Sequence, residues 1–95
     1  MKYEMMPVVD EYELQQALEL QFGPDIMGNE DVMAKVLFGD EYNNYSCKRY
    51  YFEEDEVYED HFWQNKERIR IRNCVNAMLR DMFPGRHAIL VDVSW

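Results

Sequence analysis

Apolar side chains recur at helical spacing along the first quarter of the chain. They form one stripe made of Leu14, Ala17 and Leu18, with Phe22 as a further candidate. Gly23 and the proline that follows it stop this pattern. Asp10 precedes the stripe, and its short carboxylate suits the cap of a helix start. We therefore predict a helix over about residues 11–22.

A second and shorter apolar stripe follows a polar turn. Its members are Val32, Met33, Val36 and Leu37. Asn29 precedes them as a candidate cap, and Glu30 and Asp31 add negative charge near the positive end of the helix dipole. The pattern predicts a helix that begins after Asn29 and ends at Gly39.

The longest helical stripe lies in the last third of the chain. It consists of Ile71, Cys74, Val75, Met78, Leu79 and Met82. Pro84 and Gly85 end it. The residues from Gln64 to Arg68 favour a helix and contain no breaker, so we expect the helix to reach back to about Asn65. Whether residues 54–72 form one continuous helix stays open.

Two further stretches have the character of β-strands. Residues 45–53 are rich in Tyr and Phe, and residues 87–95 alternate between two faces. One face of the second stretch consists of Ile89, Val91, Val93 and Trp95. Leu90 on the opposite face indicates that this face is partly covered. Met1–Val9 is a third candidate strand, which Pro7 restricts to a sheet edge or ends.

The order of these elements is (β)-α-α-β-α-β. It predicts an α+β fold with about three helices and a small sheet of two to three strands. The chain has 95 residues without a linker or an internal repeat, which indicates one compact domain over residues 1–95. Two pairings of the last strands remain open: a parallel right-handed βαβ unit, or a mixed or antiparallel sheet.

The chain is strongly acidic, with 19 Asp and Glu against 10 Lys and Arg and a net charge of -9. A hydrophobic content of 47% nevertheless argues against wholesale disorder. Residues 1–60 contain 16 acidic and 4 basic side chains, whereas residues 61–95 contain 3 acidic and 6 basic ones. Nucleic acid and anionic membrane surfaces repel such a chain. We therefore expect a basic protein as the partner, and no direct contact with nucleic acid or membrane.

Candidate catalytic and cofactor motifs are weak throughout the sequence. The four glycines are scattered and form no phosphate loop. Cys47, His61, Cys74 and His87 are zinc-ligand types, but they lack the paired spacing of a zinc site, and we expect both cysteines in the core. Two cysteines are too few for a disulfide framework, and the first residues lack the apolar stretch of a secretory leader. We predict a reduced, cytoplasmic protein that is not an enzyme and holds no metal or cofactor.

The most distinctive segment is a run of six carboxylates within eight residues. Its members, which we call the acidic run, are Glu53, Glu54, Asp55, Glu56, Glu59 and Asp60. On a helix, carboxylates four residues apart lie about 6 Å from each other on one side, which is of the order of the phosphate spacing in a nucleic-acid strand. Tyr58 and Trp63 lie beside the run and suit anchor contacts in a basic groove. We predict that these eight residues bind the partner.

The run EEDEVYEDHFWQ, in so small and acidic a chain, resembles acidic phage-encoded inhibitors that imitate nucleic acid, including some anti-CRISPR proteins. The resemblance implies an inhibitor that occupies the nucleic-acid groove of a host defence enzyme. The arginine-rich stretch Lys66–Arg72 and the net positive charge of the last third depart from that pattern.

Two functions from different classes follow from these patterns. The first is a small acidic interaction protein that binds a basic protein surface and blocks nucleic-acid access. The alternative is a structural or assembly module that forms a homodimer through edge strands or helix packing, with the acids only keeping it soluble. The acidic run by itself also suits an ordinary solvated helix start. The first function requires outward-facing carboxylates, and their neutralisation by the chain's own guanidinium groups would overturn it.

Overall fold

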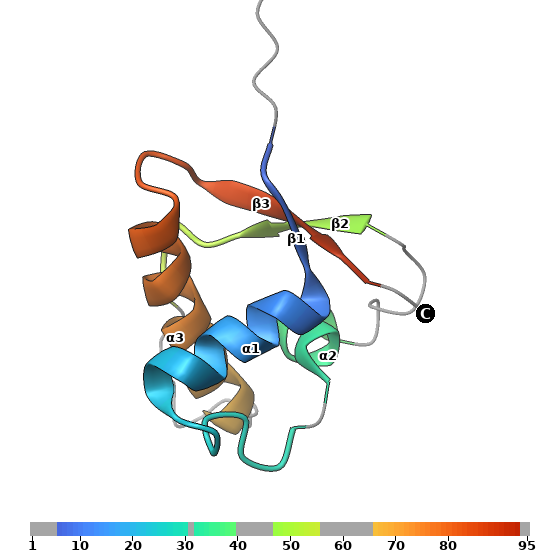
Figure 1. Ribbon diagram of the computed structural model, residues 1–95, viewed down its shortest axis with the longest axis vertical. Coiled ribbons are helices and arrows are strands. Elements are labelled where there is room, and N and C mark those ends of the chain that lie inside the picture. The colour runs from blue at the N-terminus through green and yellow to red at the C-terminus, as the bar shows by residue number, and fades with distance from the viewer. Residues whose placement is uncertain (1–5, 31, 40–46, 56–65, 94–95) are drawn as a thin grey trace, which may run out of the picture.

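The structure is a computed structural model that describes residues 6–30, 32–39, 47–55 and 66–93. Within these ranges the chain forms helices and a three-stranded sheet in the order β-α-α-β-α-β (Figure 1), which confirms the predicted α+β fold. The elements in chain order are β1 (Val8–Asp10), α1 (Glu11–Phe22), α2 (Met33–Phe38), β2 (Cys47–Tyr51), α3 (Lys66–Met82) and β3 (Ala88–Asp92).

The sheet is mixed, with the strand order β1-β3-β2. β1 runs parallel to β3, and β2 runs antiparallel to it. Of the two pairings that the sequence left open, the last two strands therefore form the antiparallel one. β1 begins directly after Pro7 and lies at the sheet edge, as its proline predicts, and the Pro7 carbonyl accepts the Leu90 N–H at 2.9 Å.

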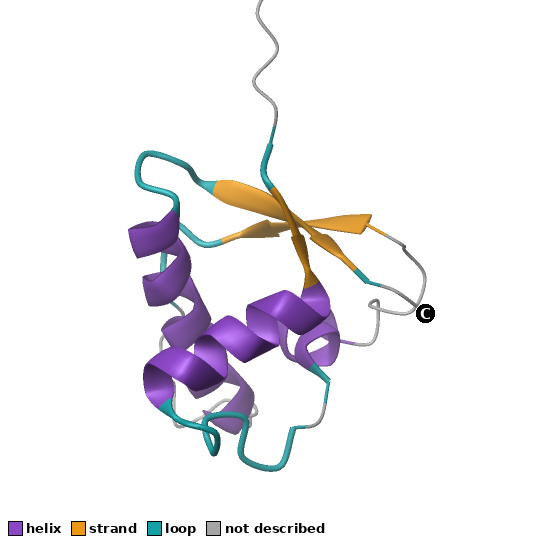
Figure 2. Cartoon of the chain, in the orientation of Figure 1, coloured by secondary structure: helices purple, strands orange, loops and turns teal. Residues whose placement is uncertain are grey.

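The helices pack on one face of the sheet, as Figure 2 shows. The residues of β3 that point toward them, Ile89 and Val91, are fully buried, and so is Val93 just beyond the strand. The predicted alternation of this segment is thus confirmed as far as the structure describes it. Leu90, on the opposite face, is half-buried.

α1 has the predicted bounds and the predicted cap. The Asp10 carboxylate accepts the Tyr12 N–H at 2.8 Å, which satisfies one of the free donors at the helix start. Leu14 and Leu18 are buried, whereas Phe22 stays outside the core. Gly23 ends the helix with a φ of 103°, a conformation that glycine adopts without steric cost.

The predicted cap of α2 is wrong. Successive hydrogen-bonded turns occupy residues 23–30, so Asn29 cannot start the helix, which begins at Met33. The residue before it, Val32, has no side-chain cap of its own. A carboxylate from α1 supplies the missing acceptor instead: Glu11 accepts the Ala34 N–H at 3.1 Å.

α3 also agrees closely with its predicted bounds. Ile71, Val75, Met78 and Leu79 of its stripe are buried, but Met82 is 47% exposed because it is the last residue of the helix and projects beyond the core.

The two cysteines are both free thiols but differ in burial. Cys74 is half-buried and packs against the core, as its place on the helical stripe predicts. The core position predicted for Cys47 is wrong, since this residue is exposed. Strand alternation accounts for the error: Tyr50 of β2 points into the core, so Cys47, three residues away, points to the other side.

Candidate functional site

The acidic run starts where β2 leaves the sheet. Phe52 is fully buried, and its N–H donates to the His87 carbonyl at 3.0 Å, which fixes the chain up to this point. Glu53, Glu54 and Asp55 follow and are exposed, in a bend that is not helical. The other predicted binding residues, Glu56, Tyr58, Glu59, Asp60 and Trp63, lie outside the residues that the structure describes, as does the helical spacing proposed for them.

Asp55 faces a guanidinium group of the same chain. Arg80 of α3 contacts it at both ends of the carboxylate, with Nη1 3.1 Å from Oδ1 and Nη2 3.4 Å from Oδ2. The same Nη1 also donates to the carbonyls of Phe52 and Glu53, at 3.3 and 3.4 Å. Arg80 therefore ties the start of the acidic run to α3.

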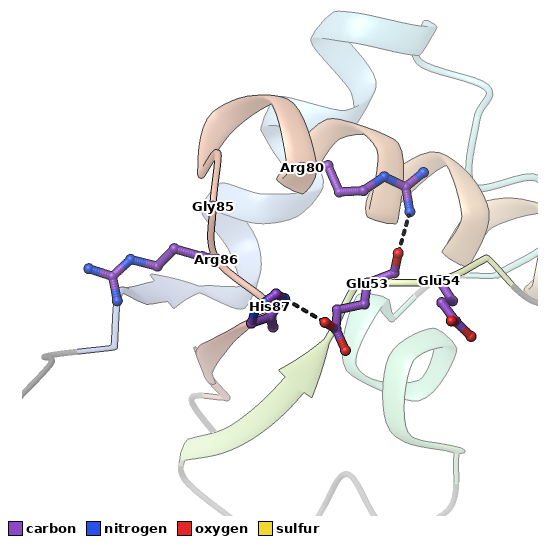
Figure 3. Close-up of a pocket in the computed structure, with 6 residues that line it drawn as sticks. All are labelled: Glu53, Glu54, Arg80, Gly85, Arg86 and His87. Atoms are coloured by element: carbon purple, nitrogen blue, oxygen red, sulfur yellow. Dashed lines mark hydrogen bonds and ion pairs between the residues drawn. The ribbon is translucent and has the colours of Figure 1, made fainter.

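Glu53 is paired differently. Its Oε1 lies 2.5 Å from Nδ1 of His87, an imidazole that carries charge only when it is protonated (Figure 3). Both side chains are more than half exposed. Ion pairs this exposed contribute at most about 1 kcal/mol to folding, because water and salt screen them.

Glu54 is the carboxylate of this segment that keeps its charge unpaired among the described residues. Its main chain is nevertheless held firmly. Asn76 of α3, only 1% exposed, donates to the Glu54 carbonyl at 3.1 Å and accepts a hydrogen bond from the Tyr50 hydroxyl. In Figure 3 the Glu54 carboxylate lies apart from both dashed contacts. A buried polar network thus fixes the backbone while the side chain remains available.

A shallow pocket of about 430 Å³ adjoins this segment. It is lined by Glu53, Glu54, Arg80, Gly85, Arg86 and His87. Charges of both signs line it and no nucleophilic Ser, Cys or Thr is among them, so its chemistry is that of a charged docking surface.

The arginines near the start of α3 have structural partners that the sequence analysis missed. Arg68 donates from Nε to the Val36 carbonyl of α2 at 2.7 Å. Arg70 donates from Nη2 to the Ile26 carbonyl at 2.8 Å and to the Glu67 carboxylate at 2.6 Å. The hydrogen bond from Arg70 lowers the pKa of Glu67. These arginines join α3 to the preceding loop and helix, which gives the arginine-rich stretch a role in the fold.

The described residues form neither a metal-binding cluster nor a helix that could span a membrane. Among them, no group of three or more His, Cys, Asp or Glu side chains lies close enough to hold a metal ion. His61 lies outside them, so the absence of zinc stays a prediction. None of the helices in the described ranges is both long and apolar enough to cross a membrane.

The fold and the site together define an α+β domain in which helices cover one face of a mixed sheet and a carboxylate segment leaves its antiparallel edge. Comparison of the chain with protein families, curated proteins and solved structures found no match.

Proposed function

We propose that the chain is a small acidic interaction protein that binds a basic protein surface and blocks nucleic-acid access to it. The observation that supports the proposal is the exposed start of the acidic run, with Glu54 unpaired among the described residues. Carboxylates held in this way can accept bidentate hydrogen bonds from the arginines of a phosphate-binding groove.

The backbone contacts of this segment favour binding. Arg80 and Asn76 already order the main chain from Phe52 to Glu54, so less conformational entropy is lost when a partner docks. A cationic partner would meet carboxylates whose main chain is already held by hydrogen bonds from Arg80 and Asn76.

The internal ion pairs change which carboxylates of the acidic run we assign to the partner. Among the described carboxylates of the run, Asp55 is the one that a guanidinium group neutralises, and Glu53 pairs with an imidazole. Both pairs are exposed and exchangeable. We therefore assign the main contacts to Glu54 and to the three acids that follow Asp55, which are Glu56, Glu59 and Asp60.

The arginine-rich stretch and Arg80 do not oppose this proposal. Arg68, Arg70 and Arg80 donate to carbonyl oxygens of the chain itself, and Arg70 and Arg80 also pair with carboxylates. These three guanidinium groups therefore bind within the chain and do not form a separate basic surface that would repel a cationic partner.

An affinity capture from host lysate at low salt, followed by elution at high salt, tests the proposal. Basic nucleic-acid-binding proteins should be captured and then released as salt rises, because exposed charges are screened. The double variant E56K/D60K should lose this capture. The matched control E13K/D81K changes the charge equally at two exposed helix positions and should retain it. Equal capture by a folded E56K/D60K chain would refute the proposal.

A further inference from the structure

α1 carries large apolar side chains on its outer side as well as on the side that faces the core. Leu14 and Leu18 are buried, whereas Tyr12 is 68% exposed and Leu20 is 88% exposed. Helical geometry places Tyr12, Gln16 and Leu20 in one i, i+4 row, on the side opposite the buried leucines. In Figure 1 this helix lies across the front of the molecule, and no described helix or strand covers it there. We call these three residues the outer row of α1.

The outer row ends beside a shallow hollow of about 440 Å³. The hollow is lined by Gln16, Glu19, Leu20 and Pro24, so the last turns of α1 and the chain just after the helix form its sides. A single exposed leucine needs no explanation. A leucine and a tyrosine in one row, with a hollow next to the leucine, instead form a surface on which the apolar face of another helix can pack.

The surroundings of the hollow are negative. Residues 10–30 contain six carboxylates and no Lys, Arg or His. Two of these carboxylates belong to the hollow or adjoin it: Glu19 lines it, and Asp25 follows Pro24 in the chain. Glu19 accepts a hydrogen bond from the neutral side chain of Gln15 at 3.2 Å, and no described cation forms an ion pair with either carboxylate. A cationic group from outside the chain can therefore contact both.

The end of α1 adds to this negative potential. The last carbonyl groups of a helix have partial negative charge, and proteins commonly place Lys or Arg in the last turn to balance it. The last turn of α1 has no basic residue. The Gly23 N–H donates to the Glu19 carbonyl at 2.8 Å and satisfies one of these oxygens, but it brings no positive charge. The hollow at this helix end thus favours a cation on electrostatic grounds.

We propose that the outer row of α1 and its hollow bind an amphipathic helix of another protein, one that combines Leu or Ile with Lys or Arg. One apolar side chain of that helix fills the hollow against Leu20, and a second packs on Tyr12. These two positions are about 12 Å apart along the helix axis, close to the rise of about 10.5 Å between residues i and i+7 of a partner helix. Lys or Arg beside the first anchor contacts Glu19, Asp25 and the helix end.

Charge separates this partner from the alternative occupants. A second copy of the chain would bring the same acidic segment against itself, and like charges repel. Nucleic acid and an anionic membrane surface are repelled for the same reason. A basic helix is attracted, and its apolar side covers Leu20 and Tyr12. The inference does not rest on the proposed function, because none of the acidic run lies on α1.

A peptide titration tests the inference. The probe is a labelled peptide of about 18 residues made of Leu, Lys and Ala, with the leucines on one face of a helix and the lysines beside them, and the full chain is added while fluorescence anisotropy is recorded. We expect a dissociation constant in the micromolar range. L20A and E19K should each weaken binding about tenfold, because one removes an apolar anchor and the other reverses an attractive charge. The matched controls M82A and E54K make similar changes at exposed positions outside the outer row and should stay within about twofold of wild type.

Comparison peptides check the chemistry of the partner. A scrambled peptide of the same composition has no apolar face, and a peptide with Gln in place of Lys has no charge, so each should bind at least about tenfold more weakly. The proposal is overturned if the Lys peptide does not bind, if either comparison peptide binds equally well, or if L20A and E19K, shown to be folded by far-UV circular dichroism, keep the wild-type affinity. Self-association of the wild type that L20A abolishes would assign the outer row to a second copy and would also overturn it.

The two proposed binding surfaces can be told apart with the same variants. E56K/D60K should bind the Lys peptide as the wild type does, since its substitutions lie outside α1. L20A should still capture a basic protein through the acidic run. Failure of one proposal is therefore distinguishable from failure of the other.

Discussion

Three arginines of α3 bind to other parts of the fold, whereas the carboxylates that follow β2 are exposed. Arg68, Arg70 and Arg80 reach back to carbonyl oxygens of earlier segments. Glu53 and Glu54 are turned to solvent after the sheet ends. Cationic side chains therefore hold the fold together, while the excess of anionic ones is left at the surface. Substitutions in the two groups should have opposite signatures, one on stability and the other on binding.

The largest loss of stability is expected at Asn76, the buried residue that holds the Glu54 main chain to α3. N76A leaves the Tyr50 hydroxyl and the Glu54 carbonyl without their partner in a buried site, which should cost about 2–4 kcal/mol in the free energy of unfolding. Denaturant unfolding measures this change. The neighbouring control A77S lies at an exposed position and should stay within about 0.5 kcal/mol of wild type.

A smaller loss is expected from the arginines near the start of α3. R68M removes the hydrogen bond to the Val36 carbonyl and should lower the free energy of unfolding by about 1–2 kcal/mol. Since methionine keeps most of the apolar stem, the change reports mainly on the guanidinium group. K35M removes a cation from an exposed position and should change stability by less than about 0.5 kcal/mol. Equal effects of R68M and K35M would contradict a structural role for Arg68.

The Glu67–Arg70 pair adds a dependence on pH. The Arg70 hydrogen bond lowers the pKa of Glu67 below its ordinary value of 4.5, so the folded chain binds this proton less readily than the unfolded chain. The stabilisation is present above pH 4.5 and is lost as the pH falls through the lowered pKa. Unfolding curves between about pH 3 and pH 6 should fall less steeply on acidification for E67Q than for wild type. Parallel curves would show that the pair does not contribute.

The smallest effect on stability, with the largest on binding, is expected at Glu54. E54K should leave the free energy of unfolding within about 0.5 kcal/mol, because its side chain has no ion pair among the described residues to lose. Capture of a basic partner should fall about tenfold, since one attractive charge becomes a repulsive one. E13K is the control for the charge change alone. If E54K lowered the free energy of unfolding as much as R68M does, the proposed difference between the structural arginines and the exposed carboxylates would be wrong.

Salt tests the proposed association without any substitution. Binding of a cationic partner should weaken as salt rises, because opposite charges attract less when screened. Capture of the partner, measured in a salt series, should therefore fall steadily, and capture that does not change with salt would contradict binding through the acidic run.

The sequence predicted the fold well because its stripes are long and end at clear signals. The α1 stripe, its Asp10 cap and the alternation of residues 89–93 all reappear in the structure. The start of α2 was not predictable locally, since Glu11 on another helix supplies the acceptor for Ala34. Local pattern rules do not contain contacts of this kind, which depend on tertiary packing.

The site was predicted less completely than the fold. The exposure of residues 53–55 follows from their charge, but their partners do not. Arg80 and Asn76 are more than 20 residues away from them, on a helix whose packing alone brings them close. The sequence shows the arginines only as a positive stretch, because the carbonyl oxygens that bind Arg68 and Arg70 lie on earlier segments that tertiary packing brings close.

The central claim is that the acidic run occupies the nucleic-acid groove of a basic protein, and displacement tests it most directly. A captured partner is loaded with a labelled oligonucleotide, and the chain is titrated in while fluorescence anisotropy is recorded. Wild type and the E13K/D81K control should release the oligonucleotide in parallel, whereas E56K/D60K should need about a hundredfold more protein. Simultaneous binding of the oligonucleotide and the wild-type chain, with anisotropy unchanged, would contradict the account.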